Sequence, residues 1–427
     1  MPPLGKIARM YLLSLPSYLN GNTAWVLLGV GALISWQYYR AQKMELALFG
    51  RVRHALPQRV LISVGLGLIG GLVGSLLLTG VGVAISTQWV SYVMYGSLAL
   101  ALVDMRLICF AYSGGLLAIS HLLFGWPQID VASLLGLVAV LHIVESVLML
   151  LSGPRLASPV YVRREDGHVV GGYTLQVFWP LPMLALVFIP HAIGGNGAGI
   201  PMPDWWPLIR PLGAPLSGDF TLYMIPLLAA LGYGDLAVTA SPRAKVRQSA
   251  ARLVLFSLIL LGLAWLGNRQ PGWLWAAAIF SPFGHELLIV LGNRQEQTGR
   301  ALWQHRGPGV MVMEVLPDGW AKRVGLRPRD VILAVNDQPL SSGAAWQEQL
   351  DLNHAAQQAE SAGVGLRLTV LRASGRRSIV QLPPGPLSEP GLLLVPDSSA
   401  HSYVESRLRS PLLWLWRQWQ QRRLSGE

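Results

Sequence analysis

"GVMVMEVLPDGWAKRVGLRPRDVILAVNDQPL", Gly309 to Leu340, is the stretch that decides how the last third of this sequence folds. Valine and methionine alternate at its start, with the period of a half-buried strand. Pro317–Gly319 then predicts a turn, a short helix follows, and a second strand ends near Asn336. A strand, a turn, a helix and a strand in so short a stretch predict a small α+β domain.

The chain as a whole is too apolar for a soluble protein. Of the 427 residues, 52% are hydrophobic and 13% are charged, and the mean hydropathy is +0.43. The apolar residues form long runs, whereas the charged residues gather in short loops and in the last third, so we expect a membrane part and a soluble part. The net charge of +11 comes largely from lysines and arginines that flank the apolar runs, which indicates contact with anionic membrane lipid and not with nucleic acid.

The apolar runs predict a polytopic α-helical membrane bundle over residues 23–292. A membrane-spanning helix needs about 20 apolar residues. Roughly nine runs approach this length: 23–39, 60–84, 88–104, 107–125, 130–151, 174–193, 220–240, 252–267 and 272–291. Residues 1–22, interrupted by Pro16, are expected to lie at the membrane interface. Closely spaced glycines in the second run predict tight helix packing: Gly65, Gly67, Gly70, Gly71 and Gly74.

Basic residues are concentrated in alternate loops. They occur in 40–59, after residue 151 and after residue 240, whereas the loops between these are nearly uncharged. The positive-inside rule therefore places the basic loops, and everything after Gly292, in the cytoplasm. In this arrangement Asp104 and Arg106 fall in a tight cytoplasmic turn, where an interfacial salt bridge accounts for both.

Ionisable residues inside apolar runs are costly and need a reason. His142 and Glu145 are three residues apart and share one helix face. They could bind a cation, or they could hydrogen-bond to each other and to a neighbouring helix. The structural interpretation is favoured because buried polar groups need partners whether or not they do chemistry.

His285 and Glu286, in "SPFGHELLI", could likewise have either a chemical or a structural role. A zinc protease helix needs a second histidine four residues after the first, and Ile289 occupies that position. Pro282 and Gly284 predict a break in the helix, whose exposed backbone groups the pair can satisfy. We therefore expect the pair to hold the last helix against the bundle through His142 and Glu145.

These patterns predict no catalytic residue, no metal site and no cofactor. The single cysteine, Cys109, excludes a disulfide within the chain and a cluster of thiolate ligands. Its apolar setting, "RLICFAYSGG", predicts a packing role.

Residues 293–397 resemble a PDZ domain of the bacterial type. The resemblance rests on "LPDGWAKRVGL", "RPRDVILAVND", the helix opening "SSGAAWQEQL" and the hairpin "GLRLTVLRASGRRSIVQL". It implies that an extended peptide, often a C-terminus, binds by strand addition beside the second helix.

One segment departs from the usual PDZ order. The loop that holds a ligand carboxylate normally precedes the domain, whereas here the matching "EPGLLLVPD", 389–397, follows it. We expect a circularly permuted PDZ in which Gly391, Leu392 and Leu393 form this loop and face Trp346 and Leu350 on the second helix. The alternative is that the segment only completes the sheet and the groove is blocked or unused.

The C-terminal tail, 398–427, predicts an amphipathic helix. One face carries Leu408, Leu412, Leu415, Trp416 and Trp419, and arginines and glutamines lie opposite. Tryptophan and arginine on such a helix suit a membrane surface. A helix that binds a protein partner is the alternative.

A polytopic bundle followed by one PDZ domain is similar to the MinJ family of division-site determinants. The motifs that carry this resemblance are "RLICFAYSGGLLAISHLLFGWPQIDV", "LHIVESVLM", "SPFGHELLI" and the PDZ followed by "GLLLVPD". The resemblance implies a non-enzymatic scaffold of the bacterial cytoplasmic membrane, enriched at septa and poles. It also implies protein partners, namely a polar coiled-coil protein, the Min system and divisome proteins.

Two other classes of function remain open from the sequence. One is a PDZ-regulated intramembrane or membrane-associated protease, which would need the missing metal ligand or a serine nucleophile. The other is a transporter that uses Asp104, His142, Glu145 and His285.

Overall fold

The computed structural model describes residues 3–50, 52–189, 200–214, 221–359, 365–382, 389–396 and 404–405. Its helices are α1 (Leu4–Ser14), η1 (Leu15–Leu19), α2 (Gly21–Phe49), α3 (Leu56–Val81), α4 (Thr87–Val103), η2 (Met105–Ile108), α5 (Phe110–Phe124), α6 (Val131–Ser152), α7 (Pro242–Arg269), α8 (Gly272–Thr298), α9 (Trp320–Arg323) and α10 (Gly343–Ala359). Its strands are β1 (Ala84–Ile85), β2 (Ser158–Arg163), β3 (Val169–Phe188), β4 (Leu222–Ala237), β5 (Val310–Val315), β6 (Val331–Val335), β7 (Gln338–Pro339), β8 (Leu366–Leu371), β9 (Arg377–Leu382), β10 (Leu392–Leu394) and β11 (Val404–Glu405).

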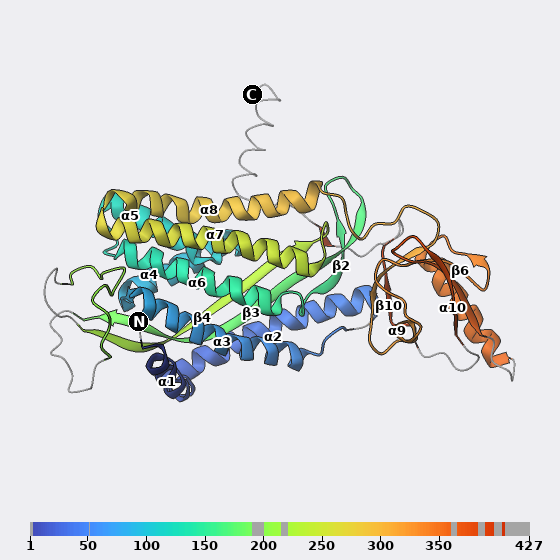
Figure 1. Cartoon of the computed structure of the whole chain (residues 1–427), viewed down its shortest axis with the longest axis horizontal. Helices are drawn as coiled ribbons and strands as arrows, with labels where there is room; N and C mark the ends of the chain where they lie inside the picture. Colours follow the sequence, from blue (N-terminus) through green and yellow to red (C-terminus); the bar gives the residue numbers. More distant parts are fainter. Residues whose placement is uncertain are drawn as a thin grey trace, which may run out of the picture.

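An apolar helical bundle precedes a small α+β domain, which lies at one end of the bundle (Figure 1). Four helices among the described residues have the length and composition needed to cross a membrane, namely α3, α6, α7 and α8. The apolar helices α4 and α5 are shorter. The predicted fold class, a membrane helical region followed by a small α+β domain, is confirmed.

Two of the expected membrane helices are strands. The runs 174–193 and 220–240 fall on β3 and β4, which pair antiparallel from Tyr173↔Ala237 to Phe188↔Leu222 and pass through the bundle (Figure 1). Pro180 and Pro182 lie within β3, and proline in a helix interior removes a hydrogen bond and clashes with the preceding turn. The expectation of about nine helices from 23 to 292 was therefore wrong at these two segments.

Pro180 and Pro182 remove no hydrogen bond from the β3–β4 ladder. The N–H groups of Phe178 and Leu184 donate outside the ladder, to the hydroxyls of Tyr38 (3.3 Å) and Ser75 (2.8 Å). Pro180 and Pro182 lie an even number of residues from Phe178 and Leu184, so their main-chain nitrogens face the same side of β3. An N–H group at either position would also have pointed away from β4. Side chains of α2 and α3 thus satisfy main-chain groups of β3 that lipid could not.

The glycines of α3 pack against this strand. A Cβ atom on Gly67 or Gly71 would overlap the carbonyl oxygen of Pro180 or Pro182, whereas one on Gly65 would meet nothing within 4 Å. Close packing was expected here, but its partner is a strand and not another helix.

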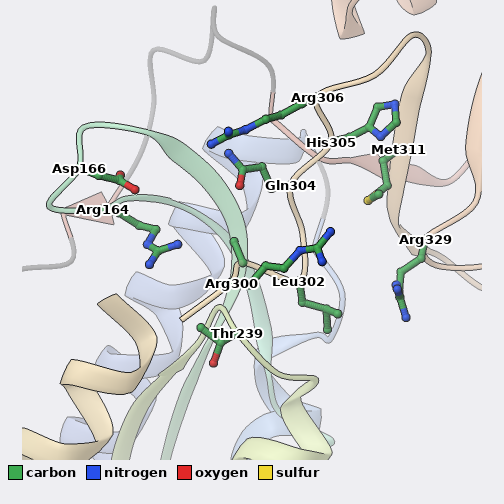
Figure 2. Close-up of a pocket in the computed structure, with 11 residues that line it drawn as sticks. Arg164, Asp166, Thr239, Arg300, Leu302, Gln304, His305, Arg306, Met311 and Arg329 are labelled. Atoms are coloured by element: carbon green, nitrogen blue, oxygen red, sulfur yellow. The ribbon is translucent and has the colours of Figure 1, made fainter. Parts of the chain in front are cut away.

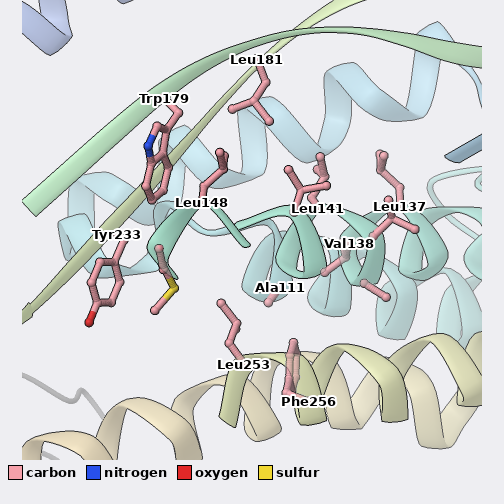
Figure 3. Packing of buried hydrophobic residues seen from close by; sticks show 14 of the residues in the cluster. Ala111, Leu137, Val138, Leu141, Leu148, Trp179, Leu181, Tyr233, Leu253 and Phe256 are labelled. Atoms are coloured by element: carbon pink, nitrogen blue, oxygen red, sulfur yellow. The ribbon is translucent and has the colours of Figure 1, made fainter. Parts of the chain in front are cut away.

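Helix α6 lies at the centre of the bundle. Figure 3 shows Leu141 and Leu148 of α6 between Trp179 of β3 and Phe256 of α7. The Trp179 indole N–H donates to the Ser152 hydroxyl at 3.2 Å. A helix that is apolar on every side is buried on every side, and most of α6 is buried.

Helices α4 and α5 form a hairpin that ends within the bundle. Cys109, at the start of α5, lies 3.2 Å from His142, which is at the middle of α6. The sequence predicted that the turn with Asp104 and Arg106 lies at one end of the bundle. It lies near the middle, because α4 and α5 are too short to span the bundle. The expected salt bridge is present, with Arg106 Nε 3.3 Å from Asp104 Oδ2.

The N-terminal segment also packs on the bundle. The Tyr11 hydroxyl donates to the carbonyl of Leu68 (2.7 Å), and that of Tyr18 donates to the carbonyl of Met183 (2.6 Å). Both tyrosines are buried. Residues 4–19 are thus tied to α3 and β3.

The C-terminal domain has its own sheet and core. The strand order is β10-β5-β6-β8-β9, with β7 paired to β6. One face packs against α9 and α10 through Val312, Trp320, Ile332 and Leu368. The strands and helices predicted between Gly309 and Leu382 are present.

Candidate functional site

Strand β10 forms the end of the C-terminal sheet among the described residues. Leu392 pairs with Val315 and Leu393 with Glu314, antiparallel. A bulge follows between Leu393 and Leu394. An end strand beside a helix is the position at which PDZ domains add a peptide strand.

Gly391 begins this strand in a conformation that requires glycine. Its φ is +64°, and an added Cβ would lie 2.7 Å from the Cα of Gly319. Its carbonyl accepts a hydrogen bond from the N–H of Leu316 at 2.8 Å. The turn predicted at Gly319 and the loop predicted at Gly391 therefore pack backbone against backbone.

The side chains expected to face one another divide between two cores. Trp346 and Leu350 lie on α10, and Leu392 packs against the same core as these two. Trp346 is only 4% exposed and Leu350 only 3%, so the domain itself covers the apolar floor beside β10. Leu393 points to the other face, into a core with Met313 and Trp303.

The outer edge of β10 is partly occupied by the membrane part. The main-chain bonds Leu316 N–H to Gly391 O and Val395 N–H to Met311 O face β5. By the alternation of a strand, the polar groups of Leu392 and Leu394 face the outer edge. The hydroxyl of Tyr161, on β2, donates to the Leu394 carbonyl at 3.0 Å.

Further contacts hold the C-terminal domain against the bundle. Arg53 forms an ion pair with Glu314 of β5 at 3.0 Å, and the Tyr173 hydroxyl donates to the carbonyl of Met313 at 3.3 Å. In the linker, the carbonyl of Trp303 accepts from the N–H of Gly171 at 2.9 Å. Burial raises the pKa of Glu314 above its ordinary value, although the nearby Arg53 acts in the opposite direction.

A basic cavity of ≈ 890 Å³ lies beside this junction. Figure 2 shows the side chains around it: Arg164, Arg300, Arg306 and Arg329 with one carboxylate, that of Asp166. The cavity therefore suits an anionic group. Sequence reasoning identified the basic loops but not this cavity, because its arginines come from segments far apart in the chain.

The intramembrane residues meet near the middle of the bundle. The rings of His142 and His285 are 5.2 Å apart at their centres, and the carboxylate of Glu286 accepts from the Tyr112 hydroxyl at 2.5 Å. Glu145 follows His142 by one turn of α6. The expected proximity of His285 to His142 is present.

Two expectations about this region were wrong. Helix α8 continues through Pro282, and the small Gly115 of α5 leaves room for the proline ring. Cys109 is not only a packing residue, since its sulfur lies 3.2 Å from His142 Nε2 and 3.6 Å from His285 Nε2. One feature of the sequence could have indicated a polar role for Cys109, namely its position beside the charged Asp104–Arg106 turn at the end of an apolar run.

The tail residues predicted to form an amphipathic face lie outside the described residues. They are Leu408, Leu412, Leu415, Trp416 and Trp419. Of residues 398–427, the structure describes Val404–Glu405, which pair parallel with β2 as β11.

Residues 311–360 match the family described as PDZ domain. The cell division topological determinant MinJ of Bacillus subtilis (strain 168) is 26% identical over 242 residues. The chain resembles MinJ and carries a PDZ domain. The MinJ match covers 56% of this chain and 56% of MinJ, so the chain spans about half the length of that relative.

A second match is much shorter than the one to MinJ. HhoA of Synechocystis sp., assigned as a serine protease, is 42% identical over 74 residues, 17% of this chain and 16% of HhoA. The MinJ match extends far beyond the length of a PDZ domain, whereas the HhoA match does not. A PDZ domain indicates protein–protein interaction.

Proposed function

We propose that this protein is a non-enzymatic membrane adaptor whose PDZ domain binds an extended protein segment at the outer edge of β10. The observation that carries the proposal is the geometry of that edge. Leu392 and Leu394 direct main-chain groups outward, and Gly391 opens the strand in a left-handed conformation against Gly319. Such an edge supplies the main-chain hydrogen bonds of strand addition, and the α10 side supplies apolar contacts.

The proposed site is closed in its resting state. Trp346 and Leu350 are covered, and Tyr161 holds one outward carbonyl of β10. A peptide must displace the Tyr161 hydroxyl and move β10 away from α10 to gain the apolar floor. Contact between the bundle and the PDZ thus lowers the affinity of the groove.

The proposed topology is multi-pass, with the PDZ and the C-terminus in the cytoplasm. The basic loops support it because they gather at the PDZ end of the bundle: Arg53 contacts Glu314, and Arg164 donates to the carbonyl of Gln297 at the end of α8. Residues 1–22, 23–292, 293–397 and 398–427 are the proposed N-terminal segment, bundle, PDZ domain and tail.

The proposed process is cell-division site selection. MinJ, to which more than half of this chain is similar, is a cell division topological determinant. The proposed partners are accordingly division proteins of the same cell, held at the septum and poles. The HhoA similarity spans too little of that protease to support proteolysis as the function.

We also propose that the basic cavity holds the phosphate of an anionic lipid headgroup. Four arginines line the cavity at the junction where the bundle meets the PDZ. Native mass spectrometry in mixed anionic and zwitterionic nanodiscs should detect retained anionic lipid, and Arg300→Ala with Arg306→Ala should reduce it. Equal retention by both proteins would remove this assignment.

Localisation of a fluorescent fusion in dividing cells of the native host tests the function. Full-length protein should concentrate at septa and poles, and a truncation after Gly292 should lose that enrichment. The full-length variant Gly391→Trp should behave like the truncation, whereas Gly375→Ala, a turn glycine with φ of +85° and open space around it, should not. A uniform membrane signal from the full-length protein would remove the division assignment.

A further inference from the structure

Three metal-ligand side chains converge inside the bundle from three different helices. Cys109 caps the start of α5, His142 lies at the middle of α6 and His285 at the middle of α8. The Cys109 sulfur and one ring nitrogen of each histidine all lie within 4.8 Å of one another. The chain thus brings a thiol and two imidazoles to one point.

The distances fit a single ion bound between these groups. Cys109 Sγ lies 3.2 Å from His142 Nε2 and 3.6 Å from His285 Nε2. Metal–sulfur and metal–nitrogen bonds of about 2.3 and 2.0–2.1 Å at a tetrahedral ion place such ligand atoms roughly 3.5 Å apart. Only small side-chain movements would be needed to bind an ion.

The surroundings of His142 prepare it as a ligand. Its Nδ1 lies 2.7 Å from the carbonyl oxygen of Val138, which can only accept, so Nδ1 carries the proton. Nε2 is then unprotonated and directs its lone pair toward Cys109. A hydrogen bond from the second ring nitrogen to a carbonyl is the usual support of a metal-binding histidine.

One sulfur lies between two histidine nitrogens. The Cys109 thiol has one proton and can donate to only one of the two Nε2 atoms. His285 Nδ1 is buried and has no hydrogen-bond partner among the residues that the structure describes. An ion would take the thiolate and both Nε2 atoms as ligands at once, whereas in its absence His285 Nε2–H must donate to the sulfur while the thiol donates to His142 Nε2.

The neighbouring side chains form a rigid wall around the cluster. Phe256 packs edge-on against His142 (5.6 Å) and His285 (5.7 Å), and Tyr112 packs against His285 at 5.2 Å. Tyr112 is itself held by Glu286. Rigid supporting contacts that fix ligand orientation are a feature of metal sites in proteins.

We propose that Cys109, His142 and His285 bind one d10 transition-metal ion, Zn²⁺ or Cu⁺. A thiolate with two imidazoles is the donor set that these ions favour. Cu⁺ with the thiolate forms a neutral site, and Zn²⁺ becomes neutral with one further carboxylate. Glu145, three residues after His142 on α6, is the carboxylate that we assign to this role. On binding, the Cys109 thiol releases its proton to solvent.

The ion would join three helices at mid-depth. The tip of the α4–α5 hairpin is then fixed to α6 and to α8, which leads directly into the PDZ linker. The proposal is independent of peptide binding, because neither the ligands nor their supports contact the PDZ groove.

Metal analysis of the purified full-length protein tests the proposal. Plasma mass spectrometry should find about one zinc or copper per chain. Cys109→Ser and His142→Ala should each lower the metal content and the affinity by more than the roughly 10–100-fold that loss of a supporting partner costs. His168→Ala, an exposed histidine outside the cluster, is the matched control and should change nothing.

Titration of the chelator-treated protein distinguishes the two ions. Co²⁺ should give a thiolate-to-metal charge-transfer band, abolished in Cys109→Ser and displaced by Zn²⁺, if the site takes zinc. Tight Cu⁺ binding against a colorimetric chelator, without a Co²⁺ band, assigns copper. Binding of neither ion by wild-type protein, or full metal content in a correctly folded Cys109→Ser variant, overturns the proposal.

Discussion

The hydroxyl of Tyr161 on β2 and the main-chain carbonyl of Leu394 on β10 are 3.0 Å apart and hydrogen-bonded. This bond joins the membrane part to the edge at which the PDZ would add a peptide strand. A main-chain group of the proposed peptide-binding edge is thus held by the protein's own bundle, and under the proposal a partner must compete with Tyr161 for it.

Removing this hydroxyl should favour peptide binding. Tyr161→Phe keeps the ring and releases the Leu394 carbonyl. The free energy of peptide binding should then become more favourable by about 0.5–1.5 kcal/mol, which is about 2- to 10-fold in affinity. The change in peptide binding is measured by the capture of peptides from a display library of random C-termini, with the protein held in nanodiscs. Tyr173→Phe, which removes a docking bond away from the β10 edge, is the control and should give a smaller gain.

Docking of the PDZ should weaken as the pH rises. Burial raises the pKa of Glu314, so the docked state binds the proton more tightly than the undocked state. The stabilisation is complete below the ordinary glutamate pKa of 4.5 and is lost as the pH rises through the raised value. Arg53, Tyr173 and Glu45 are the other titratable groups that act on Glu314.

Melting temperatures of the full-length protein and of Glu314→Gln across this pH range test the prediction. Glutamine mimics the protonated side chain and does not titrate. The wild type should therefore lose stability relative to the variant as the pH rises. A constant difference between the two proteins would show that Glu314 does not titrate on docking.

Glycine spacing in α3 should matter at Gly71 and not at Gly65. Gly71→Ala places a methyl group on the Pro182 carbonyl and should destabilise the protein by about 1–3 kcal/mol or more, as overpacking does. Gly65→Ala, in the same helix with open space, should be neutral or slightly stabilising because alanine favours helix. Thermal melting in detergent compares them, and equal loss by both would refute the contact with β3.

The buried pair Arg59–Glu45 should be sensitive to the loss of one partner. Its atoms are 2.5 Å apart, and both side chains are 1% exposed. Arg59→Met leaves the buried Glu45 carboxylate without its ion-pair partner and with only the Arg53 N–H donating to it among the described residues, which should cost about 3–5 kcal/mol. Glu45→Leu combined with Arg59→Met should recover most of the melting temperature. Failure of the double variant to recover would show that the bonds from Arg59 to Ser158 and from the Arg53 N–H to Glu45 outweigh the ion pair.

The sequence predicted most of the PDZ domain because its strands alternate and its turns contain glycine at positive φ, as at Gly391. It misassigned β3 and β4 because hydropathy measures apolarity and length, which a buried strand and a membrane helix share. Pro180 and Pro182 carried the correct information, but their tolerance in β3 depends on Tyr38 and Ser75, which are far away in the chain.

The candidate sites were predictable only in part. Periodicity places Trp346 and Leu350 on one face of α10, and a glycine before bulky residues marks β10. No local pattern indicates that Tyr161 would contact Leu394, or that Cys109 would meet His142 and His285. These are tertiary contacts between distant segments, and the short α4–α5 hairpin that creates the second contact resembles two full spans in sequence.

The most direct test of the central claim is binding of C-terminal peptides by the full-length protein with Gly391 altered. Gly391→Trp cannot adopt the left-handed conformation without strain and collides with Gly319, whereas Gly375→Ala has the same φ sign and no collision. The account predicts that wild type and Gly375→Ala select the same peptides from a display library and that Gly391→Trp selects none. Equal selection by Gly391→Trp and wild type would contradict it.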